Sequence, residues 1–308
     1  MPTGRNLRFT GPFARLQYVL LMSAFRLVRS RWRYGQLAGG LGRVFGPRTA
    51  VYLTLPGGAP FKIYLNDGYW TRFGLYHTHY EPEIAAVLHA ARGHTTLFCD
   101  LGANNGYWTT RAAAHFTKVF AVEAALATYA RLTENTAHLP SVAPIRAAVH
   151  ANSGETLTFV NTYLSHASAR LAGDTAPGTH DNTETVETIA IDDLVPDSVP
   201  ALIKLDVEGA EIAAFEGAAR AITDGSVLIY EDHGNDPDCA PSAYLMQNPD
   251  MQVFSLENGF ARVETLDAIR AGKTDSFKGY NFLAAHRTSP LLAAISNALQ
   301  NHLPADTT

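Results

Sequence analysis

The feature that most constrains the fold is a pair of short apolar segments, each ending in an acid, with a glycine turn and a helical stretch between them. The first segment ends with Asp100, and Gly102 and Gly106 follow it. The second segment ends at Glu123. This pattern predicts a strand, a tight turn, a helix and a second, parallel strand. Such a unit is typical of α/β proteins, in which helices cover both faces of a mostly parallel sheet.

The acids and glycines of this unit also indicate a ligand. Glycines let the backbone approach a bound molecule closely, and the N-terminus of a helix beginning at Tyr107 presents N–H groups to an anion. Glu123, about 20 residues after the first acid, is placed to accept hydrogen bonds from a ribose diol. The G-x-G-x-x-G dinucleotide pattern is absent, and Asp100 just before Gly102 favours S-adenosylmethionine over NAD. A strand-to-helix turn that binds nothing is the alternative.

Charge divides the chain into two parts. Of its 24 basic residues, 10 lie in residues 1–66, where there is no acid, which leaves 14 basic residues against 29 acidic ones in the remainder. The apolar run from Leu16 to Phe25 is about half of the roughly 20 residues that a membrane span needs. We expect residues 13–34 to form a basic helix. Three roles stay open for it: docking on the acidic part of the chain, lying on an anionic membrane surface, or acting as an organelle transit peptide.

The turn signals predict three regions along the chain. An N-terminal arm, residues 1–70, would combine the basic helix with a β-hairpin around the Pro-Gly-Gly-Ala-Pro sequence at 56–60. The main α/β domain would follow over residues 71–288, and residues 289–308 would form a C-terminal tail. The chain has two cysteines, too few for a disulfide framework, and this favours a reducing compartment. We therefore expect a cytoplasmic protein, with peripheral contact to the inner membrane face left open.

Strands and helices should alternate in the main domain. We expect strands at residues 97–101, 119–122, 143–149, 201–206, 227–231, 252–256 and 280–284. We expect helices at residues 81–91, 107–116, 126–138 and 210–223. Two further strands, residues 155–160 and 185–191, bracket residues 161–182, a polar insertion that we interpret as a substrate loop.

Two further predicted strands end in ionisable residues. Alternation places Lys204, Asp206 and Glu208 on one side, near the carboxyl end of a strand, where open α/β sheets bind ligands. The next strand ends at Glu231, and His233 follows it. Asp206 and His233 are candidate general bases, Glu231 is a third, and Lys204 would hold the carboxylates or stabilise negative charge. Asp206, Glu231 and His233 are also metal-ligand types, but their spacing matches no metal motif, so we expect no metal.

Together, these blocks resemble the FkbM family of S-adenosylmethionine-dependent methyltransferases over about residues 76–286. The matching motifs are Asp100–Tyr107, Val122–Ala124, Thr188–Leu194, Ile203–Glu211, Gly217–Ala218 and Gly279–Ala284. The chain departs from the family after Glu123, where a proline often follows and Ala124 stands instead. The resemblance implies a class I methyltransferase fold, a Rossmann-like sheet of seven strands with the last strand antiparallel and helices on both faces.

The resemblance also implies a site for S-adenosyl-L-methionine, with the methionine end at the glycine turn and the ribose at Glu123. The expected cofactor-binding residues are Asp100, Gly102, Ala103, Asn104, Gly106, Tyr107, Glu123, Ala124 and Asp206. The expected catalytic residues are Lys204, Asp206, Glu231 and His233.

The reaction implied by the resemblance is O-methylation of a hydroxyl on a saccharide or a polyketide-like small molecule, with a base removing the proton. Two other functions stay open. A nucleic-acid methyltransferase could use the basic arm to follow phosphates, and an NAD-linked oxidoreductase would use a similar sheet. The apolar content of the arm fits a membrane or docking role better than nucleic acid. We therefore expect a saccharide or other small-molecule acceptor as the partner, and the sequence assigns no oligomeric state.

Overall fold

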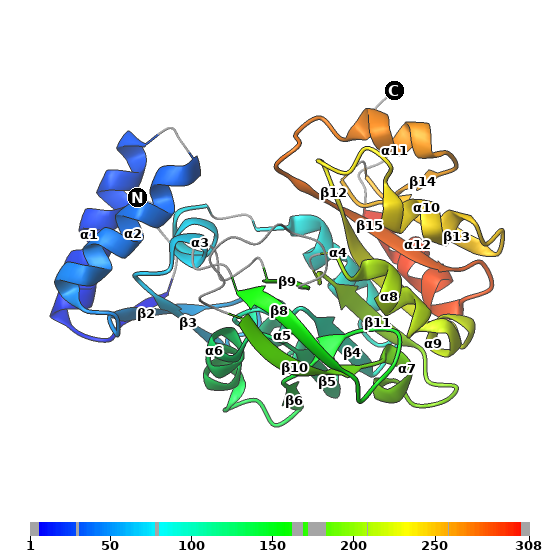
Figure 1. The fold of residues 1–308 in the computed structure, drawn as a ribbon, viewed down its shortest axis with the longest axis horizontal. Coiled ribbons are helices and arrows are strands. Elements are labelled where there is room, and N and C mark those ends of the chain that lie inside the picture. The colour runs from blue at the N-terminus through cyan, green and yellow to red at the C-terminus, as the bar shows by residue number, and fades with distance from the viewer. Residues whose placement is uncertain are drawn as a thin grey trace. The chain divides into compact units, whose positions relative to one another are not determined.

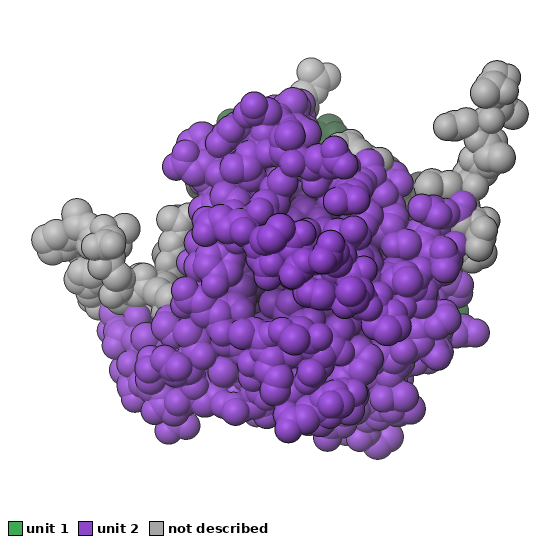
Figure 2. Space-filling model, turned by 90° about the vertical axis from the view of Figure 1, so that its right-hand side faces the viewer, with its two compact units in different colours: residues 1–81, 161–169 green, residues 82–160, 170–308 purple. Residues whose placement is uncertain are grey.

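The computed structural model describes residues 6–28, 31–77, 80–161, 169–171, 183–207, 209–257 and 259–302. The chain divides into two compact units. Unit 1 comprises residues 1–81 and 161–169, and unit 2 comprises residues 82–160 and 170–308; Figure 2 colours them separately. The predicted domain boundary at residue 70 stays a prediction.

Unit 1 combines two helices with a small antiparallel sheet (Figure 1). Its elements are β1 (Leu7–Phe9), α1 (Pro12–Leu27), α2 (Arg31–Phe45), β2 (Ala50–Thr54), β3 (Pro60–Tyr64), α3 (Gly68–Trp70) and the π-helical segment η1 (Thr71–Tyr76). The hairpin is confirmed as β2 and β3, and β1 adds a third strand beside β2. A single helix over residues 13–34 is wrong, because Val28 is extended and ends α1. The Tyr34 hydroxyl donates to the Val28 carbonyl oxygen at 3.3 Å, which holds the break between the two helices.

Unit 2 is an α/β unit built on one large sheet (Figure 1). Its elements up to the small sheet are α4 (Pro82–Ala91), β4 (Leu97–Leu101), α5 (Tyr107–Ala112), β5 (Lys118–Val122), α6 (Leu126–Thr136), β6 (Val142–Ile145), β7 (Ala148–Val149), β8 (Thr156–Asn161), β9 (Ala169–Leu171) and β10 (Thr183–Ile189). The remainder are α7 (Ile191–Leu194), β11 (Ala201–Leu205), α8 (Glu211–Glu216), α9 (Ala219–Thr223), β12 (Val227–His233), α10 (Ala240–Met246), β13 (Met251–Ser255), β14 (Ala261–Val263), α11 (Leu266–Gly272), β15 (Gly279–His286) and α12 (Pro290–His302).

The large sheet contains six of the seven predicted strands, the first part of the expected strand 143–149, and one additional strand. Its order is β14-β13-β15-β12-β11-β4-β5-β6. The neighbouring strands β12, β11, β4, β5 and β6 pair in parallel, whereas β15 is antiparallel to both β12 and β13. The additional strand is β14, which pairs antiparallel with β13 at the edge. The last strand, β15, is therefore antiparallel, as the resemblance implies, and it lies between β12 and β13.

Helices cover both faces of the sheet because its central strands are buried on both sides. On β4, Cys99 and Leu101 face one core, which also holds Phe215 of α8 and Leu245 of α10. Phe98 faces the opposite way and stacks on Phe116, which follows α5. On that second side, α4 lies against α12 (Figure 1). The residues expected to form a tail thus include a helix whose Leu291, Leu292 and Ile295 are buried.

Two predicted elements of unit 2 are interrupted. The expected strand 143–149 divides, because β6 stays in the large sheet while β7 pairs with β10 in a four-stranded sheet of order β7-β10-β8-β9. The expected helix 210–223 divides into α8 and α9 at Gly217. A Cβ atom there would lie 2.4 Å from the carbonyl oxygen of His150, so the chain after β7 passes directly against this glycine. Most of the expected substrate loop, residues 161–182, lies outside the described residues.

Candidate active site

Strand register brings the predicted ionisable residues to one edge and one face of the large sheet. Lys204 of β11 is paired with Asp100 of β4 and, on its other side, with Ile229 of β12. Since side chains alternate along a strand, Glu231 and His233 share the face of Ile229. Asp206, two residues beyond Lys204, belongs to the same face. The carboxyl ends of three adjacent parallel strands thus contribute to one polar region, as the sequence predicts.

The glycine turn after β4 has the conformation that its sequence requires. Gly102 has φ +76° and Gly106, the residue before α5, has φ +86°. A Cβ atom at Gly102 would lie 1.8 Å from the carbonyl oxygen of Asp206, so β4 and β11 approach too closely here for any side chain. Asn104 also lies in the left-handed region, with φ +51°, where asparagine is tolerated better than most residues. The two glycines and the asparagine therefore allow a tighter turn than most other residues would.

The amides of this turn are used to hold the turn itself. The N–H groups of Gly102 and Ala103 both donate to the carbonyl oxygen of Val122, at 3.0 and 2.9 Å. The N–H of Gly106 donates to Ala103 O at 2.9 Å, and Asn105 N–H donates to the side-chain oxygen of Asn104 at 2.7 Å. The N–H groups expected to face an anion are those at the start of the helix that begins at Tyr107, and this expectation stays a prediction. From Gly102 to Gly106, the turn directs its own N–H groups into the protein.

Glu123 at the end of β5 connects the turn to the next loop. Its Oε2 accepts from the N–H of Asn104 at 3.0 Å, and its Oε1 accepts from the N–H of Ala125 at 2.9 Å. Burial raises the pKa of Glu123 to about 7, and these two amide hydrogen bonds oppose that rise. Ala124, between them, is half-buried. Each carboxylate oxygen can accept more than one hydrogen bond, so Glu123 keeps acceptor capacity for a ligand.

Asp100 lies almost fully buried below the turn, with 1% of its surface exposed. Its Oδ2 accepts from the Thr109 hydroxyl at 2.5 Å, while its Oδ1 has no hydrogen-bond partner among the described residues. Burial raises the pKa of Asp100, and the Lys204 ammonium opposes this. A buried acceptor without a donor is costly. Asp100 Oδ1 is therefore a place where a donor group of a ligand would be stabilised.

Lys204 and Asp206 form an ion pair at the end of β11. Lys204 Nζ lies 3.2 Å from Asp206 Oδ2, and the Lys204 side chain is 5% exposed whereas that of Asp206 is 32% exposed. The ammonium group thus lies in the interior between two carboxylates, Asp100 and Asp206, and offsets their charge. Glu208, expected on the same side, lies outside the described residues.

Glu231 and His233 form the second polar pair of this edge. Glu231 Oε1 lies 3.3 Å from His233 Nε2, and the two side chains are 17% and 41% exposed. Gly279 of β15 makes room for this pair: a Cβ atom there would lie 1.5 Å from Glu231 Oε1. An oriented and accessible imidazole beside a carboxylate is the arrangement that a general base requires.

The sequence did not single out Gly279, Asn281 and Glu83 as site residues. Asn281 is paired with Glu231 across β15 and β12, and its Nδ2 donates to Glu83 Oε1 of α4 at 2.8 Å. The available signal was a polar residue, Asn281, within the apolar run of β15, two residues after the glycine at its start. This pair extends the polar region of the sheet edge to the first turn of α4.

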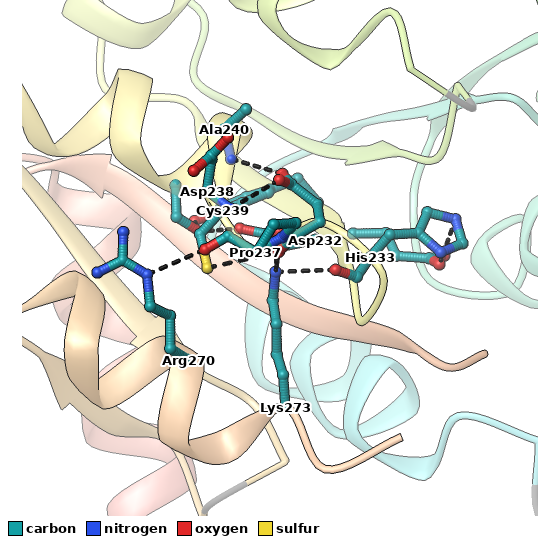
Figure 3. A network of polar contacts seen from close by, with 12 residues as sticks. Asp232, His233, Pro237, Asp238, Cys239, Ala240, Arg270 and Lys273 are labelled. Carbon is teal, nitrogen blue, oxygen red and sulfur yellow. Dashed lines mark hydrogen bonds and ion pairs between the residues drawn. The ribbon is translucent and has the colours of Figure 1, made fainter. Parts of the chain in front are cut away.

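The loop after β12 is held by α11 and the residue that follows it (Figure 3). Lys273 Nζ lies 2.5 Å from Asp232 Oδ1 and donates to the carbonyl oxygens of His233 and Asp236, at 2.8 and 3.0 Å. The Lys273 and Asp232 side chains are 4% and 0% exposed. Figure 3 shows the His233 ring directed away from this network. The buried ion pair therefore fixes the backbone from which the imidazole projects.

Within the described residues, no group of three or more His, Cys, Asp or Glu side chains is arranged to hold a metal ion. Among the helices described here, none is long and apolar enough to cross a membrane.

The strand order and the antiparallel β15 define a class I methyltransferase fold, and the polar region lies at the sheet edge where such folds bind their ligands. A family model described as the methyltransferase FkbM domain matches residues 100–261. The chain belongs to the FkbM methyltransferase family.

Individual relatives resemble the chain over part of their length. The hexuronic acid methyltransferase AglP of Haloferax volcanii is 32% identical over 168 residues, which is 51% of this chain and 64% of AglP. The structure of methyltransferase FkbM from Methylobacillus flagellatus is 18% identical, with a TM-score of 0.39 over 61% of this chain and 43% of that one. Precorrin-6y C5,15-methyltransferase from Geobacter metallireducens is 13% identical, with a TM-score of 0.39 over 68% and 90% of the two chains. The chain thus spans less than two thirds of the length of AglP.

Proposed function

We propose that this chain is an S-adenosylmethionine-dependent O-methyltransferase that methylates a hydroxyl group of a saccharide. The observation that carries the proposal is the combination of two features at one sheet edge. One is the set of carboxylate acceptors around the glycine turn, and the other is the Glu231–His233 pair on the neighbouring strand ends.

The cofactor part of the proposal depends on the donors and acceptors present. S-adenosylmethionine would supply a methyl group bound to a sulfonium, and its other polar groups include an ammonium and a ribose diol. Asp100 Oδ1 is a buried acceptor without a donor, which suits an ammonium or hydroxyl group. Glu123 presents a carboxylate whose geometry is fixed by two backbone amides. Asp100, Glu123 and the turn from Gly102 to Tyr107 would hold the cofactor.

His233 is the general base in this proposal. With its Nε2–H directed to Glu231 Oε1, the ring nitrogen Nδ1 is the atom that takes the proton from the acceptor hydroxyl. The Glu231 carboxylate orients the ring and stabilises the imidazolium that forms. Asp206 is the weaker candidate for this role, because its Oδ2 already accepts from the buried Lys204 ammonium at 3.2 Å.

The acceptor part of the proposal draws on the relative from Haloferax volcanii, which is described as a hexuronic acid methyltransferase. A uronic acid offers two kinds of nucleophilic oxygen, hydroxyl groups and a carboxylate. A carboxylate is already ionised at neutral pH and needs no base, whereas a hydroxyl does. The presence of the Glu231–His233 pair therefore favours a hydroxyl, with a methyl ether as the product.

An acceptor screen with labelled S-adenosylmethionine tests this proposal. It should include uronic-acid glycans, neutral glycans and polyketide-like alcohols, and each labelled product should be treated with mild alkali, which cleaves a methyl ester but not a methyl ether. We expect an alkali-stable product and a loss of turnover of about 100-fold or more in His233→Ala. His286→Ala, at the opposite end of β15, is the matched control and should retain wild-type turnover. An alkali-labile product made at the wild-type rate by His233→Ala would refute hydroxyl methylation.

Two alternative functions have their own tests. An NAD-linked oxidoreductase would bind NAD and not S-adenosylmethionine. A nucleic-acid methyltransferase would bind RNA or DNA with an affinity that falls steeply as salt rises.

A further inference from the structure

Helix α1 of unit 1 has one face that is buried within the unit and a second, apolar face that is exposed. Ala14, Gln17, Leu21 and Phe25 are buried along one side of the helix, at spacings of three or four residues. Leu21 and Phe25 pack with Tyr34 and Ala38 of α2 in one hydrophobic cluster. This buried side accounts for the position of α1 in unit 1.

The second face of α1 is apolar and exposed. Phe13, Leu16, Leu20 and Leu27 recur at spacings that bring them to one side of a helix. Their exposed fractions are 68%, 50%, 44% and 86%. We call these four residues the α1 stripe. A contiguous stripe of this kind is unusual on a soluble surface and marks a contact site.

Charge indicates what covers the α1 stripe. Arg15 and Arg26 lie on the same helix and are exposed. Residues 1–66, which include the whole helix, contain ten basic residues and no acid. Two copies meeting through the α1 stripe would bring these arginines together with no acid of this segment to neutralise them. An anionic lipid surface instead supplies both an apolar layer and negative charge.

We propose that the α1 stripe lies in the surface of an anionic membrane, with Arg15 and Arg26 at the headgroups. Exposed leucines then insert at the boundary of headgroups and acyl chains, and the long arginine side chains reach the phosphates. The α1 stripe belongs to unit 1 and the polar region belongs to unit 2, so the proposal does not depend on the reaction that the protein catalyses. By this proposal, a protein in which no described helix can span a membrane is bound to a lipid surface through α1.

The test is cosedimentation of the full chain with phosphatidylcholine vesicles that contain or lack phosphatidylglycerol. We expect binding to the anionic vesicles that weakens with salt, and much weaker binding to the neutral ones. The double variant Leu16→Gln/Leu20→Gln should bind at least about tenfold more weakly, and Arg15→Gln about fivefold more weakly. Glutamine is a good helix former and both leucines are exposed, so circular dichroism should show an intact fold.

Leu126→Gln is the matched control, because Leu126 is an equally exposed helical leucine, at 54%, on α6 of unit 2. It should bind vesicles as the wild type does. Failure of the wild type to bind anionic vesicles would overturn the proposal, as would equal binding by the double variant. Sedimentation equilibrium covers the main alternative: a dimer that the double variant dissociates would assign the α1 stripe to a second copy and refute the lipid contact.

Discussion

The pH dependence of cofactor affinity should report directly on Glu123. The pKa of this carboxyl is raised by burial to about 7 from 4.5, so it is largely protonated below pH 7 in the ligand-free protein. A ribose diol donates hydrogen bonds and needs the ionised carboxylate as acceptor, so binding below pH 7 requires loss of a proton. Affinity should therefore be constant above pH 7 and fall as the pH is lowered.

The size of the change in affinity follows from the raised pKa of Glu123. Each pH unit below the ligand-free pKa weakens binding by up to about tenfold, or about 1.4 kcal/mol, until the pKa of the bound state is reached. Between pH 7 and pH 5, the dissociation constant should rise by up to about 50-fold, because half of Glu123 is already protonated at pH 7. Calorimetric titration with S-adenosylmethionine over this range measures it directly.

Glu123→Gln is the matched control for this titration. Its side chain keeps an oxygen acceptor but cannot ionise, so its affinity should be lower at pH 8 and nearly independent of pH. A wild-type affinity that does not change between pH 8 and pH 5, or a variant with the same pH dependence as the wild type, would refute the assignment of Glu123 to the ribose.

The raised pKa of Glu123 also predicts that its contribution to the free energy of unfolding decreases as the pH rises. A carboxyl whose pKa is higher in the folded than in the unfolded protein favours folding fully below the unfolded value, near 4.5, and this contribution is lost as the pH rises through about 7. The free energy of unfolding of the wild type, relative to Glu123→Gln, should therefore decrease by up to about 3 kcal/mol between pH 4.5 and pH 8. Urea titrations of both proteins measure this difference, and a constant difference would contradict the raised pKa.

Three substitutions test other contacts of the site. Gly279→Ala should displace the Glu231 carboxylate, which lies 1.5 Å from the new Cβ position, and lower turnover while cofactor affinity is retained; unchanged turnover would show that this pair is not needed. Lys273→Met should destabilise the protein by about 3–5 kcal/mol in urea unfolding, because Asp232 is left buried and unpaired; the double variant with Asp232→Leu should recover part of that loss. Gly102→Ala should abolish cofactor binding or folding, since its Cβ would lie 1.8 Å from a backbone oxygen; a stable variant with wild-type affinity would refute the tight turn.

The large sheet could be predicted because its strands carry strong local signals. β4, β5 and β11 are short apolar runs that end in an acid or a glycine turn, and such runs specify a buried parallel strand without knowledge of their neighbours. The interruptions could not be predicted in this way. Gly217, where α8 and α9 divide, leaves no room for a side chain because the carbonyl oxygen of His150 lies against it, and that contact joins residues far apart in the sequence.

The candidate site likewise contains residues that local sequence could identify and residues that it could not. Asp100, Glu123 and His233 stand at strand ends, so their position at one edge follows from strand order alone. Gly279 and Lys273 could not be recognised, because each acts on a residue of another element: Gly279 leaves space for Glu231, and Lys273 holds the loop after β12.

Calorimetric titration of the purified full chain with S-adenosylmethionine and, separately, with NAD at pH 8 is the most direct test of the proposed function. We expect binding of S-adenosylmethionine at one site per chain and no binding of NAD. Binding of NAD, or of neither compound, would contradict the proposed cofactor and with it the reaction that depends on it.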